Sequence, residues 1–230
     1  MSAILAIETS ADLASAALLL GERMLTRESS GVQTHSQTIL PLVQQLLAEA
    51  GIRLKECDAI AFGCGPGSFT GVRTACGIVQ GLAFGANLPV VPVATLLAMA
   101  EACRIGHGAT DVLAVLDARM GEVYWAQYRF DGSWQEIVPP TLSSAEEVAV
   151  QGQPIACGNG LTAYAPAFEG RDFLIGALPG VVPHARDVAR LAQVAHAAGA
   201  VIAARDAQPL YLRNKVALTT AERAQKAEAA

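Results

Sequence analysis

The order of apolar and polar positions predicts a regular series of strands and helices in the first half of the chain. Short apolar runs bounded by turn residues indicate strands, and apolar residues at helical spacing indicate helices. We expect strands over 3–8, 14–20, 23–29, 58–63 and 89–93, and helices over 36–50, 70–86 and 94–103. The first helix should end at Gly51 and should hold Pro41 in its first turn, where a proline is tolerated.

The second half repeats this order of elements. We expect strands over 111–117, 122–130, 134–138, 154–157 and 173–175, and helices over 143–150 and 184–198. Each half then contains a three-strand meander, a helix, and a strand that enters a glycine loop, which is a duplication of pattern without a repeat of sequence. This order predicts an α/β fold with an N-terminal lobe over 1–103, a C-terminal lobe over 104–213 and a flexible tail over 214–230.

Composition and charge narrow the classes of function. Hydrophobic residues make up 52 % and charged residues 16 % of the 230 residues, which excludes a disordered chain. The net charge of −5 argues against independent binding to RNA or DNA. The chain shows no basic leader, no apolar run long enough to span a membrane and no CxxC pair among its five cysteines. We therefore expect a cytoplasmic protein with reduced thiols and no membrane contact.

The segment Gly63–Arg73 leads from a predicted strand through glycines into a helix. The free N–H groups of a helix N-terminus favour an anion, so the candidates for an anion-binding loop are Gly65, Gly67, Ser68, Thr70 and Arg73. Neither the Walker A pattern nor the dinucleotide pattern GxGxxG is present. A tight connection capped by Ser68 or Thr70 explains the segment equally well.

Two helices of the first half lack charge on the side that faces away from the predicted sheet. Residues 59–100 hold a single charged residue, Arg73. Because the cores of protein interfaces are depleted of charge, we expect these sides to dock onto another chain. Coverage by the second half of this chain is the alternative. The expected interface residues are Gln37, Pro41, Gln44, Ala48, Thr74, Gly77, Gln80, Gly81 and Phe84.

No catalytic or metal-binding constellation stands out. GxSxG is absent, and no two of the four histidines have the spacing of a zinc site. Glu8 and Asp117 each end an apolar strand, so the two lobes could bring them together across a cleft, although acids at strand ends are commonly solvated. We predict no catalytic residue, no metal ligand and no cofactor bound by this chain alone.

Five segments resemble one protein family. They are ILAIETSADLASAALL at 4–19, His35-Ser36 with Leu40-Pro41, GPGSFTGVR at 65–73, DARMGEVY at 117–124 and PLYLR at 209–213. Together they resemble the TsaB (YeaZ) family, bacterial proteins of tRNA threonylcarbamoyladenosine (t6A) synthesis. The family often has Asp at the position of Glu8, where an acid serves the metal–phosphate site of actin-like ATPases.

The resemblance implies an actin-like, sugar-kinase and Hsp70 ATPase (ASKHA) fold of two duplicated lobes. It also implies a non-catalytic subunit that binds and supports TsaD, the metal-dependent transferase acting on adenosine 37 of tRNA, and that recruits the ATPase TsaE. Helices of the N-terminal lobe would bind TsaD, and a similar surface would form a homodimer when the chain is alone. ATP and a metal ion would be bound in the complex with the partners, and tRNA would be bound only by that complex. The alternatives are an ASKHA ATPase or kinase whose glycine loops bind phosphates, and a glycoprotease-like peptidase.

Overall fold

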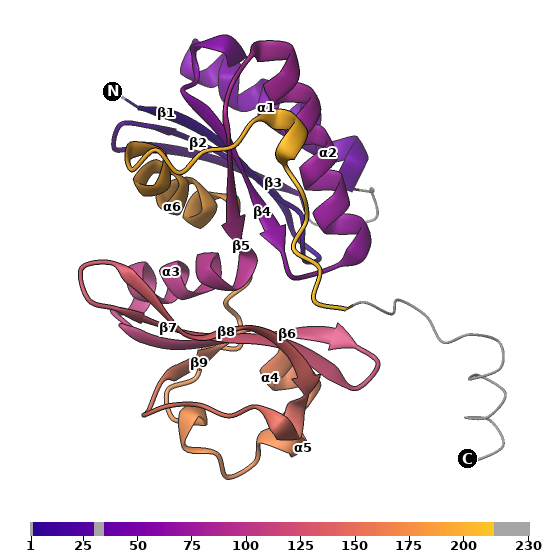
Figure 1. The fold of residues 1–230 in the computed structure, drawn as a ribbon, viewed down its shortest axis with the longest axis vertical. Coiled ribbons are helices and arrows are strands. Elements are labelled where there is room, and N and C mark those ends of the chain that lie inside the picture. The colour runs from indigo at the N-terminus through magenta and orange to yellow at the C-terminus, as the bar shows by residue number, and fades with distance from the viewer. Residues whose placement is uncertain (1, 30–34, 214–230) are drawn as a thin grey trace, which may run out of the picture.

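The N-terminal half is built on a five-stranded sheet in the order β3-β2-β1-β4-β5 (Figure 1). The computed structural model describes residues 2–29 and 35–213. The strands are β1 (Ala3–Glu8), β2 (Ala14–Leu20), β3 (Arg23–Ser29), β4 (Ala59–Gly65) and β5 (Val90–Ala94). β1 is antiparallel to β2 and parallel to β4, and β4 is parallel to β5. α1 (His35–Ala50), the short turn η1 (Leu54–Glu56) and α2 (Phe69–Ala86) provide the connections.

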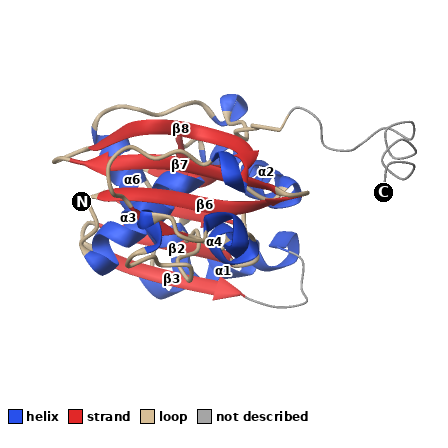
Figure 2. Cartoon of the chain, turned by 90° about the horizontal axis from the view of Figure 1, so that it is seen from below, coloured by secondary structure: helices blue, strands red, loops and turns tan. Residues whose placement is uncertain are grey.

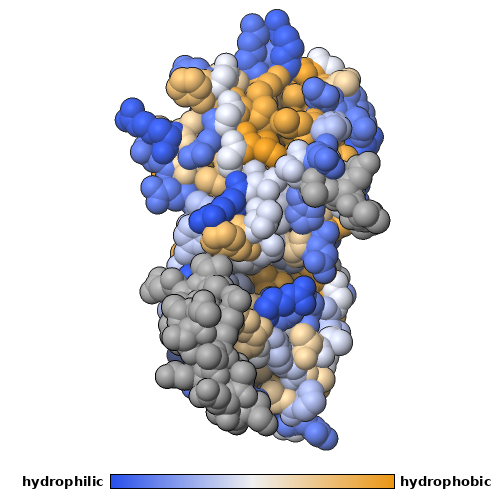
Figure 3. All heavy atoms as spheres, turned by 90° about the vertical axis from the view of Figure 1, so that its right-hand side faces the viewer, coloured by the Kyte–Doolittle hydropathy of each residue, from blue (hydrophilic) through white to orange (hydrophobic). Residues whose placement is uncertain are grey.

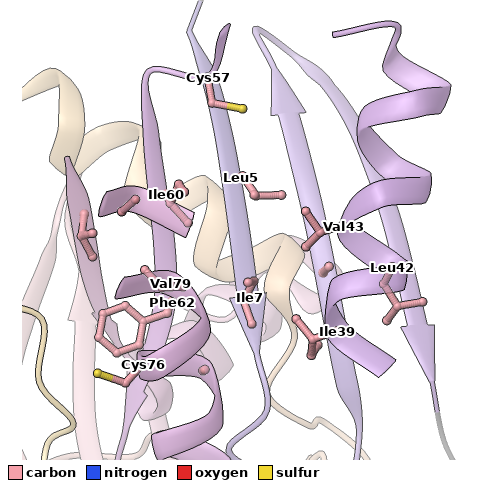
Figure 4. Packing of buried hydrophobic residues seen from close by; sticks show 14 of the residues in the cluster. Leu5, Ile7, Ile39, Leu42, Val43, Cys57, Ile60, Phe62, Cys76 and Val79 are labelled. Carbon is pink, nitrogen blue, oxygen red and sulfur yellow. The ribbon is translucent and has the colours of Figure 1, made fainter. Parts of the chain in front are cut away.

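Both faces of the strands β1, β2 and β4 are buried, which explains their nearly continuous apolar runs, whereas the edge strand β3 is partly exposed. In β1, Leu5 and Ile7 pack against Ile39, Val43 and Val79 of the helices α1 and α2 (Figure 4). The intervening residues Ile4 and Ala6 belong to a separate cluster on the other face of the sheet. The period of two along a strand therefore places successive side chains in two different cores.

The C-terminal half contains a four-stranded sheet in the order β8-β7-β6-β9, seen in front in Figure 2. Its strands are β6 (Asp111–Arg119), β7 (Glu122–Phe130), β8 (Trp134–Ser144) and β9 (Ile155–Cys157). The short helices α4 (Gly160–Ala163) and α5 (Ala165–Phe168) and the turn η3 (Asp172–Leu174) cover its outer face around Phe168. An antiparallel meander followed by a parallel strand occurs in both sheets, so the predicted duplication is confirmed for the strands.

Two helices lie between the sheets. α3 (Thr95–His107) packs on the C-terminal sheet through Leu96 and Met99, and α6 (Ala185–Ala197) packs on the N-terminal sheet through Val188 and Ala192. The layers are helices, sheet, helices, sheet and helices (Figure 1). This arrangement has the two α/β lobes of related strand order that the resemblance implied.

The expected boundary of the C-terminal lobe is wrong at its end. We expected one lobe over 104–213, but α6 buries its apolar side against β1, β2, β4 and β5 of the first lobe. Ile202 then pairs with Val90 of β5, and the turn η4 (Ala204–Asp206) packs on α2. The segment from α6 to η4 thus belongs to the N-terminal lobe, because α6 covers the face of its sheet that α1 and α2 leave open. The predicted flexible tail over 214–230 lies outside the described residues.

Three local expectations are also wrong. Pro41 lies in the second turn of α1, where it has no N–H to donate to the carbonyl of Gln37. Gln37 lies on the exposed side of the helix. The segment 143–150 is not a helix, because β8 continues to Ser144 and is followed only by the turn η2 (Ala145–Glu147). The segment 173–175 is part of the turn η3 and its end, not a strand.

Candidate functional site

The glycine loop before α2 is packed against the turn between β1 and β2. An ideal Cβ on Gly71 would lie 1.9 Å from the carbonyl oxygen of Thr9, and one on Gly67 would lie 2.6 Å from that of Ser10. The side chain of Ser68 caps α2 by accepting a hydrogen bond from the N–H of Gly71. The glycines are therefore required for close contact between two segments of this chain.

Several backbone donors of the loop are already engaged. The N–H of Gly65 donates to Thr95 Oγ1 at 3.2 Å, and the N–H of Ser68 donates to the carbonyl of Ser10 at 2.7 Å. Of the five anion-loop candidates, Gly67 and Ser68 line the cleft described next, whereas Gly65, Thr70 and Arg73 do not. Of the two readings of the segment, this geometry favours the tight connection over a phosphate cradle.

A cleft of about 380 Å³ lies between the two lobes. One wall is formed by residues 10–12, 67–69 and 72, the other by residues 116–120, 124 and 159, and residues 210–213 close it. We call residues 207–213 the C-terminal strap. Its Arg213 forms an ion pair with Glu122 and donates to the carbonyl of Arg119, which ties the strap to the C-terminal lobe. The Oγ of Ser10 is buried at this cleft with no hydrogen-bond partner among the described residues.

The two acids that could have met across the cleft have different surroundings. Glu8 is fully buried below the loop and does not line the cleft. Its carboxyl accepts a hydrogen bond from the N–H of Ser10 at 2.5 Å, and burial raises its pKa above the ordinary value of 4.5. Asp117 does line the cleft, where it pairs with Arg119 and accepts from the hydroxyl of Tyr164. The structure therefore assembles no pair of acids from these residues in the cleft.

Arg73 points to an aromatic group on the surface rather than to the loop. Its guanidinium carbon lies 3.6 Å from the ring centre of Phe69, and its Nε donates to the hydroxyl of Tyr211 at 2.6 Å. The rings of Phe69 and Tyr211 are 6.0 Å apart. We call these three residues the arginine stack; it joins the N-terminal end of α2 to the C-terminal strap.

The outer sides of α1 and α2 are exposed, as the interface hypothesis requires. Eight of the nine expected residues form what we call the outer helix face: Gln37, Pro41, Gln44, Ala48, Thr74, Gly77, Gly81 and Phe84. The side chain of Phe84 is 84 % exposed, and an ideal Cβ on Gly77 or Gly81 would meet no atom within 4 Å. Hydrophobic atoms gather on this side of the N-terminal lobe (Figure 3). In the described part of the chain, the second half, which was the alternative, leaves all of these residues exposed except Thr74, which is half-buried.

Gln80 does not belong to this face. It is half-buried, and its side-chain amide donates to the carbonyl of Ala207 at 2.9 Å, so that it holds the C-terminal strap of its own chain. The contact joins residues that are far apart in the sequence, and helical spacing alone could not reveal it.

The cysteines lie in the interior of the part of the chain that the structure describes, and the hydrogen bond to Cys157 lowers the pKa of the Cys103 thiol. All five cysteines are free and buried, and burial raises the pKa of Cys57 to about 11 and that of Cys64 to about 12, which disfavours the nucleophilic thiolate. Within residues 2–29 and 35–213, no group of three His, Cys, Asp or Glu side chains is placed to hold a metal ion. The helices among these residues include none with the length and apolar character needed to cross a membrane.

Comparison with known proteins identifies the family. A family model described as TsaD, tRNA N6-adenosine threonylcarbamoyltransferase, matches residues 23–226. The tRNA threonylcarbamoyladenosine biosynthesis protein TsaB of Haemophilus influenzae is 41 % identical, and the match covers 93 % of this chain and 94 % of that protein. The chain belongs to the TsaB family. The TsaB of Escherichia coli is 38 % identical, with 93 % of this chain and 96 % of that protein covered.

Solved structures agree with membership of the TsaB family. YeaZ from Pseudomonas aeruginosa matches with a TM-score of 0.85 and 41 % identity over 92 % of this chain and all of that chain. A second structure, described as a protein with similarity to peptidase YeaZ from the same organism, has a TM-score of 0.86 and 40 % identity over 93 % of this chain. The resemblance drawn from the five sequence segments is thereby confirmed.

Two features of the site were not found by reasoning from the sequence. Tyr211 and Arg213 lie in the PLYLR segment, which signalled the TsaB family but gave no spatial role, and their partners Arg73 and Glu122 are remote in the sequence. Ser10 lies between the predicted strands 3–8 and 14–20, and its position at the cleft depends on how the lobes meet.

Proposed function

We propose that this chain is a non-catalytic scaffold subunit of the machinery that makes t6A at position 37 of tRNA. In this role it binds and supports a TsaD homologue through the outer helix face and recruits a TsaE homologue. Binding favours the conformation of the TsaD homologue that is complementary to the outer helix face. The subunit therefore acts through its binding free energy and catalyses no step itself. The names of the H. influenzae and E. coli relatives support the pathway.

The outer helix face is the observation that carries this proposal. On the exposed side of a solvated helix, charged residues are expected, but α2 presents Gly77, Gly81 and a fully projecting Phe84. Glycine in an exposed helix costs about 0.5–1 kcal/mol relative to alanine, and no contact with another described residue requires it at 77 or 81. A partner helix that approaches closely supplies a reason for small residues, and the aromatic side chain supplies an anchor.

The proposal extends to cofactors, location and tRNA. ATP and a metal ion belong to the partner subunits, tRNA is bound only in the complex, and the complex works in the cytoplasm. The engaged donors of the glycine loop and the acidic net charge of the chain support this division of roles.

The same face also suits a second copy of this chain when the partners are absent. The exposed apolar surface around Phe84 favours burial in any available dimer. A homodimer and the complex with TsaD would then compete for one surface.

A substitution pair tests the proposal. Gly81→Arg places a long charged side chain on the outer helix face, where the monomer has free space, and Gly106→Arg makes the same change on α3, where the space is also free. We expect Gly81→Arg to abolish co-purification with the TsaD homologue and t6A formation in a reconstituted assay, and Gly106→Arg to leave both intact. Equal binding by both variants would reject the docking role.

The same reconstitution separates the alternative functions. Omission of each chain in turn should stop t6A formation, whereas ATP turnover or protein cleavage by the isolated chain would favour an ATPase or a peptidase instead. Turnover lost on Arg73→Ala would support the ATPase specifically.

A further inference from the structure

Arg73 is the one charged residue of α2, and it lies on the same side of the helix as the outer helix face. It precedes Gly77 by one turn and Gly81 by two, which places the three residues in one row. The guanidinium is exposed and its Nε is held by Tyr211, and no carboxylate of the described residues forms an ion pair with it. The charge is therefore presented in a fixed direction, and no carboxylate among residues 2–29 and 35–213 neutralises it.

Docking would change the surroundings of this charge. The following step rests on the proposed function, because it assumes that a partner covers the outer helix face. A guanidinium that loses water without gaining an acceptor is strongly unfavourable, so a partner that binds here must supply one. Arginine suits this role because its planar fork pairs bidentately with a carboxylate, and the aromatic rings restrict its freedom before binding.

We infer that the arginine stack is the charged anchor of the docking interface and that it binds a carboxylate of the partner chain. Phe69 and Tyr211 are 40 % and 44 % exposed, so the stack offers an aromatic surface beside the charge. Arginine and aromatic residues are the types that dominate binding at interfaces. The partner surface therefore combines an acidic side chain at the N-terminal end of α2 with a closely approaching, small or apolar surface along Gly77, Gly81 and Phe84.

Tyr211 acts through Arg73 as a positioning residue. Its hydroxyl accepts the hydrogen bond from Nε, and this leaves the two terminal nitrogens of the guanidinium for the partner. Tyr211 also belongs to the strap whose Arg213 is tied to the C-terminal lobe, so the direction of the anchor depends on a segment that bridges both lobes.

Four variants of the full chain test the inference by titration against the TsaD homologue of the same organism. Arg73→Met keeps the length and the packing on Phe69 but removes the charge, and we expect at least a 10-fold loss of affinity. Arg73→Glu should lose clearly more than Arg73→Met, because it adds repulsion of a carboxylate to the loss of attraction. Arg73→Lys should recover only part of the loss. Arg129→Met, at an exposed site on β7, is the control of equal charge change and should bind as the wild type does.

The role of Tyr211 is tested in the same titration. Tyr211→Phe should weaken binding about threefold in the wild-type background and should have no effect in the Arg73→Met background. Equal affinities of wild type and Arg73→Met, or equal losses for Arg73→Met and Arg73→Glu, would overturn the carboxylate anchor while leaving the docking role in place. Absence of binding by the wild type would overturn both. Thermal unfolding of each variant shows that any loss is not caused by misfolding.

Discussion

Replacement of Gly81 by alanine is expected to have opposite effects on the isolated chain and on its complexes. Gly81 lies in the interior of α2, and the ideal Cβ meets no atom within 4 Å. The methyl group therefore causes no clash in the folded chain. It also lowers the conformational entropy of the unfolded chain, which favours the folded state. In a complex, the same methyl group would stand between two helices that approach closely.

The magnitude follows from helix propensity alone. Alanine is favoured over glycine in a helix interior by about 0.5–1 kcal/mol. For a chain of 150–250 residues, 1 kcal/mol corresponds to roughly 2–4 °C in Tm. We therefore expect Gly81→Ala to raise the Tm of the isolated chain by about 1–4 °C and to weaken binding of the TsaD homologue.

The measurement is thermal unfolding at several protein concentrations, together with a titration of the partner. Dilution separates the intrinsic effect from any homodimer that uses the same face. Gly106→Ala on α3 is the matched control, because its Cβ also enters free space but lies away from the outer helix face. It should raise Tm without a change in binding. A lower Tm for Gly81→Ala at every concentration would refute the reasoning, since it would mean that the fold itself needs this glycine.

Two further predictions concern the loop and the acid below it. Gly71→Ala should destabilise the chain by about 1–3 kcal/mol or more, because its Cβ would lie 1.9 Å from the carbonyl oxygen of Thr9; the control Gly77→Ala on the same helix should not, and an unchanged Tm for Gly71→Ala would contradict the packed loop. Glu8→Gln should make the chain more stable than the wild type at neutral pH. Burial raises the pKa of Glu8, so its contribution to stability is present below about pH 4.5 and is lost as the pH rises through the folded-state pKa. The advantage of the variant, measured by urea unfolding across pH, should shrink towards pH 4.5, and a constant difference would argue against this account.

Much of the fold could be predicted from the sequence because both sheets have strong local patterns. The five-residue apolar run Ala3–Ile7 of β1 and the helical spacing in α1 and α2 arise because residues close together in the sequence are buried in the same core. The failures have a common cause in tertiary context. β8 runs past Pro139 and Pro140 to Ser144, which is tolerated because β8 is the edge strand of its sheet.

The candidate site was predictable where it depends on a single helix and not where it depends on distant segments. The uncharged side of α2 follows from its own sequence. Seven of the nine predicted interface residues are exposed, whereas Thr74 and Gln80 are half-buried. Arg73 was assigned to an anion loop because it is near the N-terminus of α2, yet its contact is Tyr211, which is 138 residues away. No local pattern indicates where a strap near the end of a chain will lie.

The position of α6 has a consequence for synthesis of the protein. The apolar face of the first sheet around Ile4, Ala61 and Val91 is covered by a helix that begins only at Ala185. In a nascent chain, this apolar face therefore stays exposed until the second lobe and α6 have been translated. Expression of residues 1–183 alone would yield a sheet with one bare side, so the first lobe is not an independent folding unit despite being the first to leave the ribosome.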